Sequence, residues 1–216
     1  MAEIVLVRHG QANSYATDEA SYDQLSDLGQ QQATWLGTHL RDTTEHFDRV
    51  LTGTLKRQID TARAMGFDNP TEDTRLNELA YFELTEAARR QHDMAVPDSP
   101  AGFARYLPRV IELWTQDGLD DVPERFGDFA DRVQSIIDEQ CRSAGRTLFV
   151  TSGGVIGMAV RHSLNLDTSG LAKVMLQITN ASIHRLHYVH ENLMLGGFNA
   201  TPHLDGPERS HARTYV

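Results

Sequence analysis

Arg8, His9 and Gly10 follow a short apolar stretch, residues 4–7, near the start of the chain. A neutral imidazole at the end of a strand can present a ring nitrogen to an electrophile, and a glycine beside it keeps the turn free of side-chain bulk. The guanidinium of Arg8 offers two parallel N–H donors, a geometry that suits a phosphoryl group. Tripeptides recur by chance, so this one alone fits phosphate chemistry and an ordinary strand-terminal histidine equally well.

Two further motifs add charged side chains to this one. They are the run Leu55-Lys56-Arg57-Gln58 with Thr61-Ala62 after it, and the run Arg75-Leu76-Asn77-Glu78-Leu79. With the first motif they form an ordered set that resembles the histidine phosphatase superfamily, whose fold is called phosphoglycerate mutase-like. That family has a strand ending in Arg-His-Gly, a "leucine, any, arginine" helix start before Thr-Ala, and a "leucine, any, glutamate" carboxylate. These three elements match in identity, order and spacing, and the resemblance covers nearly the whole chain.

The segment that follows the first motif resembles one kind of family member. Gln11-Ala12 comes directly after the glycine, and Tyr22-Asp23, Leu25-Ser26 and Leu28-Gly29 come soon after. This arrangement is similar to that of phosphatase-type members, so the resemblance favours a phosphatase.

One position departs from the family pattern. Where the family has a second histidine in a turn from strand through His-Gly-Gly to helix, this sequence reads Val150-Thr151-Ser152-Gly153-Gly154-Val155-Ile156. The glycines and flanking apolar residues are present, but Ser152 stands at the imidazole position. The family's histidine contacts phosphoryl oxygens, so a hydroxyl there implies one ionic contact fewer. Such a loss is worth about 1.5–3 kcal/mol, or roughly ten- to a hundred-fold in rate.

The resemblance implies a role for each matched residue. His9 would attack phosphorus and carry the phosphoryl group as phosphohistidine. Arg8 and Arg57 would neutralise the phosphoryl oxygens, with no metal ion or other cofactor. Glu78 would protonate the leaving oxygen and then activate water, and Glu83 is the alternative carboxylate for that role.

Further phosphate-binding candidates follow from position. Asn13 lies close after the first motif, and Ser152 with Gly153 begins a predicted helix, whose N-terminal N–H groups attract anions. His203 is the residue that would compensate for the missing histidine, although a surface-loop histidine is the commoner case. Two more residues have only an approximate motif position, namely Asn180 and Ser182.

The chemical groups fall at the ends of predicted strands and the starts of predicted helices. Short apolar runs predict buried strands at 4–7, 49–52 and 147–151. Apolar spacing predicts helices from Ser26 or Asp27 to Leu40, from Leu55 to Met65, over 126–141 and over 155–164. Later strand candidates are 175–179, 182–189 and 193–198. This alternation predicts an α/β fold in three layers, with an open, mostly parallel sheet and helices on both faces.

The middle of the chain, about residues 82–124, breaks this rhythm. It has patchy helical patterning and contains Pro97, Pro100, Pro108 and Pro123. We expect an insertion that lies like a lid over the carboxyl edge of the sheet, where open α/β folds bind their ligands. No linker or repeat divides the chain, so residues 1–216 are expected to form a single domain.

Composition limits the expected partners. The 216 residues carry 30 acidic and 20 basic side chains, a formal charge of −10. This balance argues against nucleic acid and anionic membranes as partners, but not against a small phosphoester held by local arginines. The single cysteine and the lack of a long apolar run lead us to expect a cytoplasmic protein. No metal site is expected, because among His184, His187 and His190 only the first and last would share a strand face.

The sequence therefore favours a phosphomonoester hydrolase that acts on a small phosphorylated metabolite. A phosphoglycerate mutase is the alternative, although residues 79–83 lack the glycines that follow the glutamate in mutases. A protein that binds phosphorylated ligands without turnover is a third hypothesis, suggested by Ser152. The joint presence of a nucleophile and a proton donor speaks against it. Neither the substrate nor the oligomeric state follows from the sequence.

Overall fold

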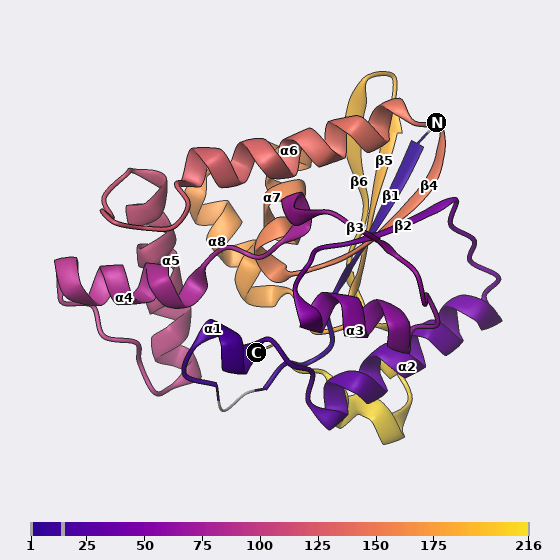
Figure 1. Ribbon diagram of the computed structural model, residues 1–216, viewed down its shortest axis with the longest axis horizontal. Coiled ribbons are helices and arrows are strands. Elements are labelled where there is room, and N and C mark those ends of the chain that lie inside the picture. The colour runs from indigo at the N-terminus through magenta and orange to yellow at the C-terminus, as the bar shows by residue number, and fades with distance from the viewer. Residues whose placement is uncertain (1, 14–15, 216) are drawn as a thin grey trace.

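A six-stranded sheet forms the centre of the computed structural model, which describes residues 2–13 and 16–215 (Figure 1). Its strands are β1 Ala2–Arg8, β2 Arg49–Thr52, β3 Thr71–Glu72, β4 Gly145–Thr151, β5 Ile183–Val189 and β6 Asn192–Ala200. Their spatial order is β3-β2-β4-β1-β5-β6. The first four in that order are parallel, and β5 is antiparallel to both β1 and β6. The expected open α/β sheet is confirmed, with two antiparallel pairings at one side.

The alternation of side chains along β1 explains why helices cover both faces. Ile4 and Leu6 belong to one buried cluster, whereas Val5 and Val7 belong to the other. A strand that is apolar at successive positions requires cover on both sides, because its side chains alternate between the faces.

Figure 1 shows that cover as two groups of helices. One face packs against α2 Asp27–Asp42 and α3 Lys56–Ala64, and the other against α6 Phe126–Arg142, α7 Gly153–Leu164 and α8 Thr168–Gln177. Shorter elements are α1 Glu19–Tyr22 and the 3-10 turns η1 Thr74–Leu76, η2 Pro202–Leu204 and η3 Pro207–Ala212. In the described ranges, no helix is both long and apolar enough to cross a membrane.

The prediction of a strand at 175–179 was wrong. Met175 lies in α8, which begins after Asp167, whose carboxylate accepts a hydrogen bond from the N–H of Gly170 at 2.7 Å. Leu171 and Met175 project from one side of α8 toward Gly157 of α7. A short apolar run does not distinguish a strand from a buried helix, and here packing against α7 decides for the helix.

The expected insertion forms two helices, α4 Tyr81–His92 and α5 Pro100–Thr115. Ser99 caps α5 by accepting from the N–H of Gly102, and Pro100 occupies the first turn, where a missing N–H does no harm. Trp114 of α5 packs its ring against Phe126 and Phe129 of α6. Much of this segment therefore belongs to the main core, and one end of α4 approaches the carboxyl ends of the parallel strands.

Candidate active site

The parallel pairing of β1 with β4 brings the first and last sequence motifs together. Arg8 stands opposite Thr151 in the register, and the N–H of His9 donates to the carbonyl of Thr151 at 2.8 Å. His9 and Ser152 are therefore the next residues on two adjacent strands, at the same edge of the sheet.

His9 is held as a neutral imidazole with one ring nitrogen available. Its Nδ1 lies 2.7 Å from the carbonyl oxygen of Gly10. A carbonyl only accepts, so Nδ1 carries the proton and Nε2 keeps its lone pair. Burial of the ring, which is 1% exposed, holds the pKa of His9 well below its usual value, and the charges of Arg57 and Arg8 lower it further. An unprotonated Nε2 is the form that can act as a nucleophile.

Gly10 is required by close contact. A Cβ at this position would lie 2.3 Å from the carbonyl oxygen of Gly29 at the start of α2. The Gly10 N–H donates to Oγ1 of Thr61 at 3.0 Å, and the Thr61 hydroxyl donates to the carbonyl of Arg57 at 2.6 Å. The threonine of the second motif thus ties the His9 turn to α3.

Arg57 is fully buried beside this turn. Its Nη1 donates to Glu19 at 2.8 Å and to Asp23 at 3.2 Å, whereas Nε and Nη2 are buried without a partner among the described residues. Asp23 also accepts from the N–H groups of Lys56 and Arg57, at 2.8 and 3.0 Å. It therefore caps α3 from another segment, which fixes the start of the helix that carries Arg57.

Arg8 divides its donors in the same way. Its Nη1 donates to the carbonyls of Ile178 and Tyr215, and in the described part of the chain its Nε is buried with no partner. A Cβ built on Gly153 would lie 3.9 Å from both Arg8 Nε and Glu78 Oε2. The side chains of Arg8 and Glu78 therefore both lie close to Gly153, the first residue of α7.

Glu78 sits on the N-terminus of α7. Both its carboxylate oxygens accept from the N–H of Gly154, at 3.0 and 3.1 Å, and Oε1 also accepts from the N–H of Leu79. A Cβ on Gly154 would come within 2.2 Å of Oε1, so the second glycine of the turn makes room for the carboxylate. We expected the first turn of α7 to offer its N–H groups to phosphate, but the Gly154 N–H is taken by Glu78.

A residue that the motifs did not indicate holds the loop that carries Glu78. Arg132 of α6 donates through Nη1 to the carbonyls of Arg75 and Asn77, both at 2.8 Å. Its Nε and Nη2 form a pair of hydrogen bonds with Glu124 at 2.6 and 2.9 Å. The guanidinium is thereby fixed on one side by a carboxylate and on the other by the backbone of residues 75–77. No feature of the sequence singled out Arg132 among the arginines.

Ser152 is fully buried and has a partner that the sequence did not reveal. Nε2 of Gln58 donates to Ser152 Oγ at 2.8 Å and to the carbonyl of Leu76 at 3.1 Å. Gln58 directly follows Arg57 on α3 and stands within the second motif, so its position was visible while its contact was not.

The helix α1 covers the site with an aromatic ring and a carboxylate. The Tyr22 ring meets the His9 ring edge-on with centroids 6.4 Å apart, and the Arg57 guanidinium lies 4.8 Å from the Tyr22 centroid. Burial raises the pKa of Glu19, the Arg57 charge opposes that effect, and the nearby charges of Glu78 and Glu83 add to it. Glu83 itself is exposed on α4. Glu19 therefore lies between the buried Arg57 and two further carboxylates, those of Glu78 and Glu83.

The remaining predicted residues are spread around and beyond this centre. Asn13 donates through Nδ2 to the carbonyl of Ser21 in α1. Asn180 donates to the carbonyl of His9 at 3.3 Å, and Ser182 bonds to the buried His184.

His203 lies in η2, which packs against α2. Burial lowers the pKa of His203 to about 4, with a smaller contribution from His39, and no member of the His9 site contributes. Its ring nitrogens have no partner among the described residues. The structure thus places His203 by α2 rather than with His9, so the geometry gives no support to compensation for Ser152.

Solved structures with this fold cover nearly all of the chain. A phosphoserine phosphatase mutant from Entamoeba histolytica in complex with phosphoserine is 19% identical, with a TM-score of 0.68 over 94% of this chain and 100% of that one. A mycobacterial glucosyl-3-phosphoglycerate phosphatase with inorganic phosphate is 24% identical, with a TM-score of 0.67 over 94% and 99%. A putative alpha-ribazole-5'-P phosphatase from Escherichia coli K-12 is 19% identical, with a TM-score of 0.66 over 93% and 98%.

These likenesses establish the fold, while a family model establishes the relationship. No curated protein matches the sequence. The model of the histidine phosphatase superfamily, branch 1, matches residues 4–201. Because that match spans most of the sequence and contains all three motifs, this chain belongs to the histidine phosphatase superfamily.

Proposed function

We propose that this protein hydrolyses phosphomonoesters through a phosphohistidine formed on His9. The observation that carries the proposal concerns the two arginines whose charges act on His9: three of their guanidinium nitrogens are buried without partners in the described residues, namely Nε of Arg8, and Nε and Nη2 of Arg57. Burying such donors unpaired is costly unless a ligand pairs them. They stand beside a neutral imidazole, and a phosphoryl group supplies the acceptor oxygens that both arginines lack.

The first chemical step is transfer to the histidine. The Nε2 lone pair of His9 forms the N–P bond while the ester P–O bond breaks, and Glu78 gives its proton to the departing oxygen. The hydrogen bond from Nδ1–H to the Gly10 carbonyl fixes the ring and favours the positive charge that the ring gains. Arg8 and Arg57 balance the charge on the phosphoryl oxygens throughout.

The second step regenerates the enzyme. A water oxygen forms the new P–O bond while the N–P bond breaks, and the carboxylate of Glu78 takes the proton from the water. His9 leaves as the neutral imidazole with its proton still on Nδ1. Glu78 is well placed for both steps, since the N–H of Gly154 holds its carboxylate beside Arg8. No metal ion or cofactor enters this scheme.

We further propose that the leaving group is small and contacts α1 and α4. Tyr22 and Phe82 lie edge-on with centroids 5.9 Å apart, and Tyr22 also meets the His9 ring. These rings, together with the Glu19 carboxylate, lie where the rest of a phosphoester would extend from the phosphoryl group. Phosphoserine, which one solved relative binds, is a small phosphomonoester. Residues 82–124 would then form the lid over the site that the sequence predicted.

The test compares wild type with His9→Ala on p-nitrophenyl phosphate and a panel of small phosphomonoesters, in the presence of a metal chelator. We expect hydrolysis by the wild type and none by the variant. Equal activity in both proteins, or no activity in either, would refute the proposal. Interconversion of 2- and 3-phosphoglycerate in the presence of bisphosphoglycerate would instead establish the mutase alternative.

A further inference from the structure

The contact between Gln58 and Ser152 determines which way the serine proton can point. The amide nitrogen of Gln58 must face the Leu76 carbonyl, because the reversed amide would set two oxygens against each other. The same nitrogen donates to Ser152 Oγ at 2.8 Å. Ser152 therefore accepts from Gln58, and no described residue accepts the proton of its own hydroxyl. That proton is available for a ligand.

Ser152 is placed beside the phosphoryl site by the strand register. It lies one residue beyond Thr151, which pairs with Arg8, and so stands next to His9. In parallel strands, residues at matching register positions project from the same face. Gln58 reaches Ser152 from α3, where it directly follows Arg57. The serine hydroxyl thus lies among the same elements that carry the two unpaired arginines.

The side chain of Gln58 is buried and closely packed. A Cβ on Gly53 would lie 2.0 Å from Gln58 Oε1 and 2.6 Å from Asn77 Oδ1, so the amide fills the space between β2 and the loop after η1. Its Oε1 is buried with no partner in the described chain. A buried, unpaired amide oxygen does not favour the folded state. Stability alone is therefore a poor reason for a glutamine at this position.

We infer that Gln58 is a positioning residue that directs the Ser152 hydroxyl proton to the phosphoryl oxygens. The uncharged pair of Gln58 and Ser152 would then replace the contact that the family's second histidine makes with those oxygens. The inference rests on the proposed function. A neutral pair adds no charge to the site and does not titrate near neutral pH. It also occupies the space that an imidazole at position 152 would need.

The first test is a double-mutant cycle with Gln58→Leu, Ser152→Ala and both together, measured as kcat/KM and as the affinity for vanadate. We expect Ser152→Ala to lower kcat/KM roughly 10- to 100-fold and Gln58→Leu about tenfold. The double variant should be no worse than Ser152→Ala, because Gln58 acts through the serine. Independent, additive losses would overturn the inference.

Controls separate this role from a structural one. Gln30→Leu makes the same change on the exposed side of α2 and should leave both readouts unchanged. Gln58→Glu nearly keeps the shape but substitutes an acceptor that captures the serine proton, so its losses should match those of Ser152→Ala. A Gln58→Glu protein with wild-type kinetics and vanadate affinity would contradict the inference, and its melting temperature shows whether it is folded.

The second test exchanges the pair for a histidine. Ser152→His alone should lower activity, because Gln58 fills the space beside position 152, and adding Gln58→Ala should restore it. A gain in Ser152→His that does not depend on Gln58 would overturn the inference. If the wild type hydrolyses no phosphoester, the proposed function fails, while the vanadate affinities still test the contact between Gln58 and Ser152.

Discussion

The arginines at the two ends of the parallel strands differ in how completely their guanidinium nitrogens are paired. Toward the amino end of β1, Arg146 and Arg185 share the carboxylates of Glu3 and Glu45, with contacts of 2.7 and 3.1 Å to Glu3 and 2.6 Å from Arg185 to Glu45. No nitrogen of either arginine is among the buried, unpaired atoms of the described residues. At the carboxyl end, Arg8 and Arg57 have three such nitrogens. We infer that the paired arginines stabilise the fold and that the unpaired nitrogens of Arg8 and Arg57 bind a ligand.

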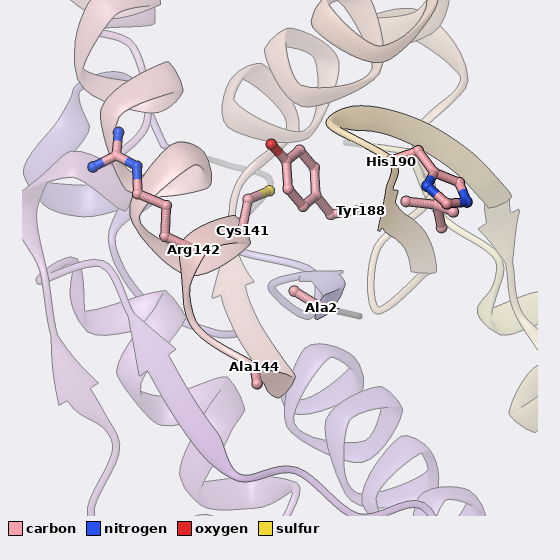
Figure 2. A pocket seen from close by; sticks show the side chains of 7 residues that line it. Ala2, Cys141, Arg142, Ala144, Tyr188 and His190 are labelled. Atoms are coloured by element: carbon pink, nitrogen blue, oxygen red, sulfur yellow. The ribbon is translucent and has the colours of Figure 1, made fainter.

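The amino end also shows that a pocket by itself is not a site. Figure 2 shows Cys141 and Tyr188 facing each other in a pocket there, while Arg142 extends away from them. Burial raises the pKa of the Cys141 thiol to about 11, so it carries no thiolate near neutral pH. The imidazole of His9, which we propose as the nucleophile, lies instead at the buried carboxyl end. The two ends of the sheet differ in whether their arginines are paired with carboxylates, and the presence of a pocket does not identify the functional site.

The largest effect should come from making one substitution at both ends. Arg57→Met should lower kcat/KM about 10²–10³-fold, since it removes preorganised donors from the charge that develops in the transition state. Arg185→Met should leave kcat/KM unchanged and lower the melting temperature by about 2–4 °C, the effect of losing about 1 kcal/mol. Steady-state kinetics and thermal melts check both. A comparable loss of kcat/KM in Arg185→Met would show that the arginines at the two ends do not differ in function.

The next effect concerns the loop that carries Glu78. Arg132→Met removes the two hydrogen bonds to the carbonyls of Arg75 and Asn77, and we expect kcat to fall roughly 10- to 100-fold with a smaller change in KM, because the carboxylate loses its alignment. Arg125→Met is the matched control, since Arg125 precedes α6 and its side chain, among the described residues, makes only an exposed 3.7 Å pair with Asp117. Unchanged kcat in Arg132→Met would show that the backbone N–H groups of Leu79 and Gly154 suffice to position Glu78.

The sequence predicted the site residues that belong to local motifs at the ends of adjacent parallel strands. Arg8, His9, Arg57 and Glu78 were predicted from motifs, and parallel strands bring such motifs to one edge of the sheet by topology alone. The cap of α3 by Asp23 and the hold of Arg132 on the loop depend on side chains far apart in sequence, which no local pattern encodes. For the same reason Met175 was assigned to a strand, because its helical state depends on packing against α7.

The next prediction concerns the protonation state of His9 at the carboxyl end of the strands. The pKa of His9 lies well below its usual value through burial and the two arginines, so in the folded protein the ring stays neutral as pH falls past 6.5, while the unfolded chain takes up a proton there. His9 therefore lowers folding stability progressively below pH 6.5 and has no such effect above it. Titration of the ¹⁵N signals of the ring should show Nδ1–H and no transition between pH 6 and 8. A midpoint near 6.5 would contradict the buried, neutral form.

The smallest effect is at the amino end and lies in a more acidic window. Burial acts to raise the pKa of Glu3 and of Glu45, but the hydrogen bonds and charges of Arg146 and Arg185 outweigh it, so both values are lowered. Their stabilisation is present above the unfolded pKa of 4.5 and is lost as pH falls through the lower folded value. Replacing both carboxylates by glutamine should flatten the unfolding free energy against pH below about 4.5. An unaltered slope would mean that the paired arginines do not stabilise the fold.

Capture of the phosphoryl group on His9 would identify the nucleophile directly. In the proposed mechanism Glu78→Gln cannot activate water, whereas p-nitrophenyl phosphate releases its phenolate without a proton donor, so this variant should accumulate phosphohistidine. Alkaline quenching followed by peptide mass spectrometry should locate the adduct on His9, with none in the His9→Ala protein. His9 would be excluded as the nucleophile if the wild type turns over while neither it nor Glu78→Gln carries an adduct on His9. An adduct on another residue would exclude it as well.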